Sequence, residues 1–444
     1  MKSRGSAILL VGVCLAGQGS PGVAQPSCSP LPSPGGTIVE VYPGEAGTLA
    51  NIVAAVATGT TIVLHDGFYD MSDGDGNSRL TFDTPGVTLR SASGARANVI
   101  LDGGYGTNEL VSIHASEVTI ADITLQRAYD HPIHISGYQG SPITGVVIHN
   151  VRILDPGQQA IKINPDVDGW VDNGVVECSS IELTDTGRTQ IRDDCYTGGI
   201  DAHAARGWVV RRNRIEGFWC PTGLSEHGIH FWRASRDTLV EQNVIVDCAR
   251  GVGFGLGSMG GTRVYADDPY PGVNNKGHID GVVRNNFIAA TDTNLFGSEY
   301  GFDTGIGLEQ AAGARVLHNS VASSQTPASS SIEWRFSSTF AEVANNLTTH
   351  QLLARDGGLA TLQGNISTAA TDWFVDVSAG DLHLDLPGIG AVDTGAVLPV
   401  SWVVVDVDDE MRDSLPDVGA DEIVDPIFSD GFESGDLSAW SAFN

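Results

Sequence analysis

Short segments in which apolar and polar residues alternate recur along the chain, and this period of two predicts β-strands. Successive side chains of a strand point to opposite faces, so each segment buries its apolar residues on one side only. No amphipathic helix of useful length separates the segments, which argues against alternating strands and helices. The clearest segments are 132–136, 160–164, 199–203, 228–232, 251–255, 305–309 and 331–335.

A second set of apolar segments is marked by a recurring asparagine, which indicates a repeated turn. The intervals between these asparagines are 30, 43, 33, 27 and 19 residues, and the longest contains a Gly- and Pro-rich insert at 257–277. Asparagine tolerates the left-handed region of the backbone, so we expect these residues to adopt it and to stack as a side-chain ladder. The clearly spaced asparagines are Asn213, Asn243, Asn286, Asn319, Asn346 and Asn365, and Asn150 marks an earlier segment of the same kind.

The two sets of segments together predict a solenoid. A coil of roughly 22–30 residues with three short strands closes on itself and stacks on the next coil through parallel ladders, which buries one continuous core. Residues 60–70 and 87–101 fit the first coils.

These repeats resemble the right-handed parallel β-helix of the pectate-lyase-like superfamily over residues 45–395. The sequence Gly-Thr-Thr-Ile-Val-Leu at 59–64 and the repeated asparagine ladder carry the resemblance. The segment 417–422 is similar to a closing motif of secreted bacterial proteins with this architecture, and 428–440 is similar to a short C-terminal tail of exported bacterial proteins. The resemblance implies an all-β fold built as a right-handed parallel β-helix.

The chain therefore divides into five parts. Residues 1–24 combine a basic start with a short apolar run and end in Gly-Val-Ala, which is typical of a cleaved signal peptide. We expect the mature protein to be secreted, either extracellular or periplasmic. The other parts are a lead-in at 25–44, the β-helix at 45–395, a closing segment at 396–425 and a tail at 426–444.

The composition agrees with a turn-rich exported protein. Glycine accounts for 55 of the 444 residues, too many for a helix bundle. The formal net charge of −30 argues against nucleic acid and anionic membranes as partners. No segment of the mature chain approaches 18 apolar residues, so we expect no membrane insertion, and we expect a monomer.

Cysteine usage also fits an oxidising compartment. Cys178, Cys195, Cys220 and Cys248 lie within about 70 residues, a clustering that predicts one or two disulfides among them. Cys28 is then left over.

Strand alternation places a set of chemically active side chains on one outer face. If the Ile or Val of each strand points inward, the next residue and the one two further on point outward, and coils lie about 4.8 Å apart. Lys162, the only lysine inside the recurring segments, then joins Asp201, His203 and His230 in one solvent-accessible cluster beside the flat face of Trp232. The surrounding residues expected to bind substrate are His134, Asn164, Glu226, Trp232, Arg233, Arg250 and Glu309.

Glycine continues the same outward columns in the following coils, at Gly253, Gly255 and Gly307. Because glycine has no side chain, we expect this part of the face to stay open as a groove for an extended ligand.

The resemblance implies an enzyme acting on acidic or neutral polysaccharide, most readily a lyase. Lyases of this superfamily use β-elimination, in which a cation neutralises a uronate carboxylate, a base removes the C5 proton and an acid assists the leaving oxygen. We expect Lys162 to be the base, with a pKa lowered by burial and by neighbouring positive charge. Arg233 or Arg250 would bind the carboxylate, and His203 or His230 would transfer protons.

Several alternatives stay open, because no established lyase or hydrolase motif matches. A glycoside hydrolase would use Asp201 with Glu226 or Glu309, and an epimerase would fit the same scaffold. Asp201 could instead orient a histidine or hold Ca²⁺, and with His203 and His230 it resembles a transition-metal set. We expect no other cofactor. A non-catalytic polysaccharide-binding or surface β-helix is the alternative from another class.

Overall fold

The computed structural model describes residues 28–75, 78–167, 169–192, 194–256 and 263–423. The expected signal peptide and the expected C-terminal tail lie outside these residues. Within them, no helix is both long enough and apolar enough to cross a bilayer.

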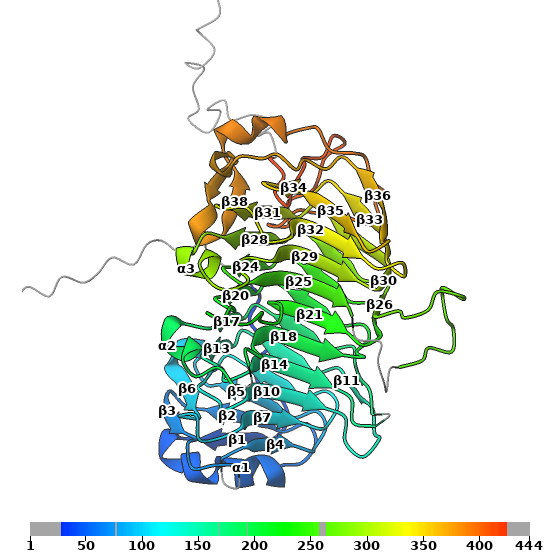
Figure 1. Cartoon of the computed structure of the whole chain (residues 1–444). Coiled ribbons are helices and arrows are strands. Elements are labelled where there is room, and N and C mark those ends of the chain that lie inside the picture. The colour runs from blue at the N-terminus through cyan, green and yellow to red at the C-terminus, as the bar shows by residue number, and fades with distance from the viewer. Residues whose placement is uncertain (1–27, 76–77, 168, 193, 257–262, 424–444) are drawn as a thin grey trace, which may run out of the picture.

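Three long parallel sheets run along the molecule, and successive strands of the chain join sheet 1, sheet 2 and sheet 3 in turn (Figure 1). Sheet 1 carries the outward columns described above. It consists of β4 (Leu80–Phe82), β7 (Glu109–Ile113), β10 (His131–Ser136), β14 (Gln159–Asn164), β18 (Gly198–His203), β21 (Ile229–Trp232), β25 (Arg250–Gly255), β29 (Thr304–Glu309), β32 (Ser330–Arg335) and β35 (Leu352–Arg355).

Sheet 2 begins with the first strand of the described chain and is the longest. It consists of β1 (Ile38–Val41), β2 (Thr61–Leu64), β5 (Thr88–Ser91), β8 (Thr119–Ala121), β12 (Val147–His149), β16 (Val175–Glu177), β19 (Val209–Arg211), β22 (Ser235–Arg236), β23 (Leu239–Glu241), β26 (His278–Ile279), β27 (Val282–Arg284), β30 (Ala311–Leu317), β33 (Phe340–Ala344) and β36 (Leu359–Gln363).

Sheet 3 closes each coil before the chain returns to sheet 1. It consists of β3 (Gly67–Asp70), β6 (Val99–Asp102), β9 (Thr124–Gln126), β13 (Arg152–Leu154), β17 (Ser180–Glu182), β20 (Arg214–Glu216), β24 (Val244–Val246), β28 (Phe287–Ala290), β31 (Ser320–Ser323) and β34 (Leu347–Thr348). Two small sheets complete the strands: parallel β11 (Ile143–Thr144) with β15 (Val171–Asp172), and antiparallel β37 (Phe374–Asp376) with β38 (Asp381–Leu384).

The core consists of aligned apolar columns inside the stack. On sheet 1, Ile133 pairs with Ile161, Ile161 with Ile200 and Ile200 with Ile229, and all four side chains are fully buried. Each coil therefore covers the apolar residues of the one before it, as a solenoid requires. The predicted right-handed parallel β-helix is confirmed.

The asparagine ladder runs along the turn between sheets 2 and 3. The backbone N–H and the Nδ2 group of Asn213 both donate to Asn243 Oδ1 at 3.0 Å, and Asn243 Nδ2 donates to Asn286 Oδ1 at 2.9 Å. The same pattern continues to Asn365.

The backbone geometry of this ladder differs from the expectation. The left-handed conformation belongs to the residue before each ladder asparagine, for example Gln242 with φ 56° and His318 with φ 50°. The preceding residue turns the chain, which leaves the asparagine free to point inward and to bond backbone carbonyls such as that of Val210.

The N-terminal end of the stack is covered by a helix that the sequence pattern did not predict. Helix α1 (Ala46–Ala55) buries Leu49 and Val53 against the first coil (Figure 1). The exposed end of a solenoid core needs such a cover. The other helices are short: α2 (Asp185–Arg188), α3 (Thr293–Phe296), and the 3₁₀ turns η1 (Pro43–Glu45), η2 (Arg96–Asn98), η3 (Thr371–Trp373), η4 (Val377–Ala379) and η5 (Leu386–Gly390).

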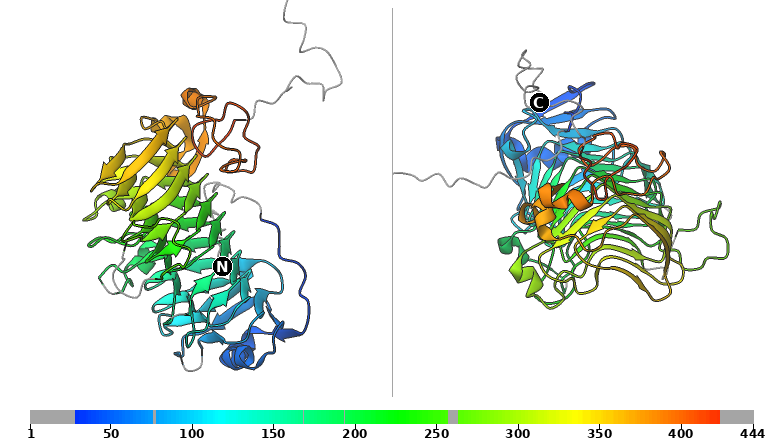
Figure 2. Two further views of the ribbon diagram at one scale, coloured as in Figure 1. Left: turned by 90° about the vertical axis from the view of Figure 1, so that its right-hand side faces the viewer. Right: turned by 90° about the horizontal axis from the view of Figure 1, so that it is seen from above.

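Two disulfides brace the outside of the stack. Cys195 pairs with Cys220, as expected for at least one bridge within the cysteine cluster. Cys28 pairs with Cys178, so the expectation that Cys28 is left over is wrong, and buried Cys248 is the free thiol among the described cysteines. The lead-in lies along the side of the coils (Figure 2), which brings Cys28 to a turn 150 residues away in sequence.

The segment before residue 423 packs against the same turn as the ladder. Arg412 donates to Glu422 at 2.8 Å in a buried ion pair and to Asn285 Oδ1 at 3.2 Å. Gln242 Nε2 donates to the carbonyl of Asp406 at 2.9 Å. This segment thus packs beside the turns that carry Gln242 and Asn285.

Candidate active site

The outward columns of sheet 1 have the register that strand alternation predicts. Lys162 of β14 aligns with Asp201 of β18, which aligns with His230 of β21. In the second column, His203 aligns with Trp232. Residues scattered over 70 positions therefore lie on three adjacent strands.

An ion pair between Lys162 and Asp201 forms the centre of this cluster. Lys162 Nζ donates to Asp201 Oδ2 and, at 2.9 Å, to the hydroxyl of Tyr196. The other carboxylate oxygen, Asp201 Oδ1, accepts the Nε1–H of Trp232 at 2.7 Å. Burial alone would raise the pKa of Asp201, but the Lys162 ammonium holds it well below its usual range. Asp201 is therefore ionised.

The pKa of Lys162 is raised, which corrects the expectation of a lowered value. Burial does disfavour the ammonium, but the negative charge of Asp201 and the contact with Tyr196 outweigh that effect. Lys162 is consequently a cation at neutral pH and cannot accept a proton there.

His203 is the neutral member of the cluster. Its Nε2 lies 3.2 Å from Lys162 Nζ and 3.4 Å from Asp201 Oδ2. Burial lowers the pKa of His203, even though Asp201 acts in the opposite direction. The ring is therefore unprotonated at neutral pH, and its Nε2 lone pair faces the ammonium of Lys162.

His230 belongs to a different set of contacts than predicted. Its Nδ1 lies 3.1 Å from Glu226 Oε2, and its Nε2 lies 3.1 Å from the carbonyl oxygen of Gly255. The ring stacks on Trp232 with centroids 5.0 Å apart. Trp232 thus contacts both His230 and Asp201.

The cluster is more buried than expected. Lys162, Asp201 and His230 are buried, whereas His203, Tyr196 and Trp232 are half-buried. The loops that return from sheet 3 to sheet 1 supply the cover, because Tyr196 contacts Lys162 and Glu226 contacts His230. Solvent and ligands therefore reach the cluster beside His203, Tyr196 and Trp232.

The two predicted arginines have different roles. The Arg233 guanidinium lies 4.8 Å from the Trp232 ring, and its Nε atom is buried without a hydrogen-bond partner among the described residues. Arg250 instead donates from Nε and Nη2 to the carbonyl of Ser225 at 3.0 and 2.6 Å. Arg233 thus packs against the Trp232 ring, while Arg250 anchors the loop before Glu226.

The remaining predicted binding residues make their contacts in neighbouring coils. His134 Nε2 lies 2.6 Å from Asn164 Oδ1, and its Nδ1 bonds Glu109. Glu309 pairs with Arg335 at 2.8 Å. These residues flank the cluster along the sheet.

The groove expected over the glycines is filled at one point by a side chain. A Cβ atom on Gly253 would lie 2.5 Å from Nε2 of His227, a residue of the loop before β21. Glycine at 253 therefore makes room for the His227 ring, and the expectation of an open face at this position is wrong.

Tyr196 is the functional candidate that the sequence did not reveal. It follows Cys195 in the irregular loop between β17 and β18, where no strand alternation assigns a direction to its side chain. The disulfide of Cys195 with Cys220 fixes that loop. The cysteine beside it was the one available signal.

Comparisons with known proteins agree on the fold. No protein-family model and no curated protein sequence matches this chain. Among solved structures, pectate lyase Pel9A superposes with a TM-score of 0.50 at 13% identity, over 87% of this chain and 96% of that chain. The chain has the fold of a pectate lyase. An alginate lyase from Paenibacillus sp. str. FPU-7 gives a TM-score of 0.49 at 15% identity, over 73% of this chain and 98% of that chain.

In this β-helix, Asp201 does not suit calcium. Both of its carboxylate oxygens are engaged, by Lys162 and by the Trp232 indole, whereas Ca²⁺ requires six or more oxygen ligands. The transition-metal set expected from Asp201, His203 and His230 does not form either, because His230 directs its nitrogens to Glu226 and to a backbone carbonyl.

Proposed function

We propose that the protein is a secreted polysaccharide-active enzyme that cleaves uronic-acid-containing chains by β-elimination on the outer face of sheet 1. The observation that carries the proposal is the position of Lys162. It is held as a cation between Asp201, the Tyr196 hydroxyl and the neutral ring of His203. One site thus offers a positive charge, a base and an acid.

Positive charge is what a uronate requires first. Neutralising the carboxylate makes the adjacent C5–H more acidic, and desolvated cations do this most strongly. Lys162 supplies one such charge. Arg233, whose guanidinium can bind a carboxylate through two N–H groups, supplies a second beside Trp232.

Proton transfer is then assigned to His203 and Tyr196. As the uronate carboxylate draws the Lys162 ammonium away, His203 takes the C5 proton at Nε2, and the electron pair of the C5–H bond forms the C4–C5 double bond as the C4–O bond breaks. The Tyr196 hydroxyl gives its proton to the leaving oxygen. Asp201, 3.4 Å from His203 Nε2, stabilises the imidazolium that results, and Lys162 stabilises the phenolate.

Trp232 provides a surface for the sugar. Its ring is half-buried and held on one side by the His230 stack and by its own hydrogen bond to Asp201. A fixed aromatic face of this kind packs against a pyranose ring at little entropic cost. The site lies on a sheet face, which suits a polymer that continues in both directions.

A hydrolase is less well supported because it needs a protonated carboxylic acid. Asp201 is ionised. In Glu226, burial would raise the pKa of the carboxyl, but His227 and His230 lower it below its usual range. Asp201 and Glu226 are therefore in the wrong protonation state to act as the acid.

Export is supported by the covalent structure. Two disulfides, one of which joins the lead-in to the stack, form and persist in oxidising compartments. The expected cleaved signal peptide would deliver the chain there.

The test is a panel of uronate polymers incubated with the purified mature chain. We expect an increase in ultraviolet absorbance from the unsaturated product on at least one polymer, with reducing ends rising in parallel. Reducing ends without absorbance would identify a hydrolase. Binding without either signal on any polymer would support the non-catalytic alternative.

A further inference from the structure

Three groups of metal-ligating side chains occur among the described residues, and they differ in whether a lone pair is free. Each group brings three donor atoms within 4.8 Å of one another. A metal ligand must present an unprotonated nitrogen or an oxygen that is not already committed. This requirement separates the three groups.

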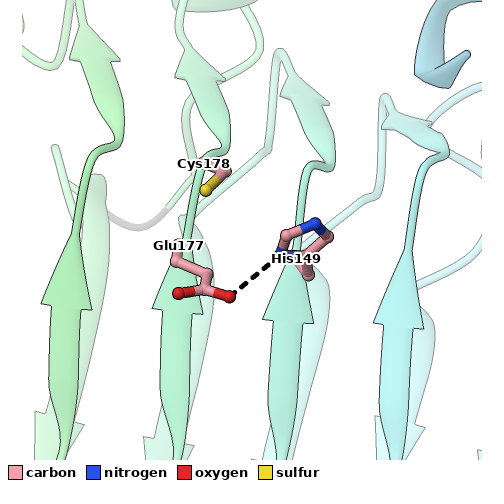
Figure 3. Close-up of side chains that lie close together, drawn as sticks. All are labelled: His149, Glu177 and Cys178. Atoms are coloured by element: carbon pink, nitrogen blue, oxygen red, sulfur yellow. Dashed lines mark hydrogen bonds and ion pairs between the residues drawn. The ribbon is translucent and has the colours of Figure 1, made fainter. Parts of the chain in front are cut away.

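The first group consists of His149, Glu177 and Cys178 (Figure 3). His149 Nδ1 bonds Glu177 Oε1 at 2.9 Å, while the sulfur of Cys178 is in the disulfide with Cys28. A disulfide sulfur is not a thiolate, so the group lacks a third ligand.

The second group, His383 with Asp408 and Asp421, fails for another reason. His383 Nδ1 bonds Asp381 and its Nε2 lies 2.7 Å from Asp408. Burial would lower the pKa of His383, but these carboxylates raise it to about 9. Both nitrogens carry protons, and the ring has no lone pair to offer.

The third group, Glu226, His227 and His230, has a free nitrogen. His227 is 3% exposed, and its Nδ1 is buried without a hydrogen-bond partner among the described residues. This nitrogen lies 3.9 Å from Glu226 Oε2, and His230 Nδ1 lies 3.1 Å from the same oxygen. Burying a polar nitrogen without a hydrogen-bond partner destabilises the fold. A bound ligand at this nitrogen would remove that penalty.

We propose that Glu226, His227 and His230 bind a divalent transition-metal ion of the Zn²⁺ class through one carboxylate oxygen and two Nδ1 atoms. Ligand atoms around tetrahedral zinc lie about 3.3 Å apart, given metal–nitrogen and metal–oxygen distances near 2.0–2.1 Å. The separations of 3.1 and 3.9 Å bracket that value.

The hydrogen bonds around the site support this assignment. His230 Nε2 faces the carbonyl oxygen of Gly255 at 3.1 Å, so it carries a hydrogen and leaves Nδ1 as the nitrogen directed at Glu226. A ligating histidine characteristically donates its other N–H to a carbonyl in this way.

The surrounding chain holds the third ligand in place. The His227 ring fills the space above Gly253, where any Cβ atom would collide with it. Arg250 acts against a cation because it lies nearby, but its guanidinium is turned to the carbonyl of Ser225. Two imidazoles and one carboxylate favour zinc or its first-row neighbours over Ca²⁺.

The test measures Zn²⁺ binding by titration calorimetry on untagged, chelator-treated protein, followed by Co²⁺ substitution read in the visible absorption spectrum. We expect one Zn²⁺ per chain with a micromolar or tighter Kd, and cobalt bands of low coordination number. His227→Gln and, separately, Glu226→Gln should each weaken binding about 100-fold. Circular dichroism establishes that each variant is folded.

His149→Gln is the matched control, because it removes a buried histidine paired with a glutamate in a group that lacks a third ligand. It should leave the Zn²⁺ affinity unchanged. Absence of Zn²⁺ binding to the wild-type protein, or equal affinity in folded His227→Gln or Glu226→Gln, overturns the proposal. No substrate is involved, so a protein inactive on every uronate polymer would leave this outcome unaffected.

Discussion

Two stacks of buried polar side chains run along the same solenoid, and they are built on opposite plans. The asparagine ladder repeats one residue type, and each amide donates to the next at 2.9–3.0 Å. The cluster on sheet 1 changes residue type at every coil, from Lys162 to Asp201 to His230. Identical amide side chains in adjacent coils form hydrogen bonds with one another, whereas different titratable side chains in adjacent coils shift one another's pKa values.

This difference separates a structural role from a chemical one. In the ladder, the amides donate both to the next asparagine and to backbone carbonyls, so burial is compensated and nothing is left for a ligand. In the cluster, a buried ion pair holds a half-buried neutral base and a half-buried phenol, while the Nε atom of Arg233 has no hydrogen-bond partner in the described part of the chain. Unsatisfied or strongly coupled groups of this kind characterise functional sites. The predictions below follow their expected effect on turnover, from largest to smallest.

Lys162→Met should lower turnover on the susceptible uronate polymer by about 10³-fold, because it removes the charge and the contact to Tyr196. It should also destabilise the fold by about 3–5 kcal/mol, since the carboxylate of Asp201 stays buried without its partner. Product absorbance and urea unfolding measure the two effects.

The double variant Lys162→Met/Asp201→Asn separates those effects. Removing both charges should recover most of the stability while activity stays lost. Recovery of turnover in this variant would show that Lys162 acts only by neutralising the buried charge of Asp201.

His203→Gln should lower turnover by about 10²-fold with little change in stability, because the ring is half-buried and transfers a proton. Burial lowers the pKa of His203, so the wild-type base stays unprotonated as the pH falls through about 6.5, the ordinary imidazole value. The acid limb of kcat/KM should therefore lie below that pH. An acid limb at or above it would exclude His203 as the base.

The double variant Cys195→Ala/Cys220→Ala, which removes the disulfide, should lower turnover roughly 5-fold. Without the disulfide the loop that carries Tyr196 is no longer fixed, so the Tyr196 hydroxyl is held less well in position to donate its proton. The loss of stability should be about 3 kcal/mol for a bridge that spans 25 residues. The pair Cys28→Ala/Cys178→Ala is the matched control, and it should change stability without changing turnover. Equal effects of the two pairs on turnover would argue against a positioned Tyr196.

Asn243→Ala should leave turnover within about 2-fold of wild type but destabilise the protein by about 2–3 kcal/mol, since two donors of Asn213 lose their acceptor inside the core. Thermal unfolding measures the loss. An unchanged melting temperature would mean that the ladder contributes no net stability.

The sequence was sufficient for whatever strand alternation determines. A period of two specifies the face of each side chain, and stacking specifies its neighbour, so the alignment of Lys162 with Asp201 and of His203 with Trp232 could be predicted. The ladder asparagines could be predicted too, although the left-handed residue is the one before each of them.

The sequence was insufficient for features that depend on the path of a loop or on the distance between two side chains. Tyr196 and His227 lie on irregular returns to sheet 1 whose course depends on a disulfide and on packing over glycine. Whether the pKa of Lys162 is raised or lowered depends on how closely Asp201 approaches its ammonium, and the pairing of the strands does not give that distance. The pairing of Cys28 depends on the path of the lead-in along the outside of the stack (Figure 2).

The most direct test of β-elimination by this cluster is the mass spectrum of the fragments released from a defined oligouronide by the wild-type chain. Elimination adds no water, so we expect fragment masses that sum to the mass of the substrate, with one fragment carrying an unsaturated terminal sugar. Masses that sum to the substrate plus one water would show hydrolysis and would contradict the roles given to Lys162, His203 and Tyr196.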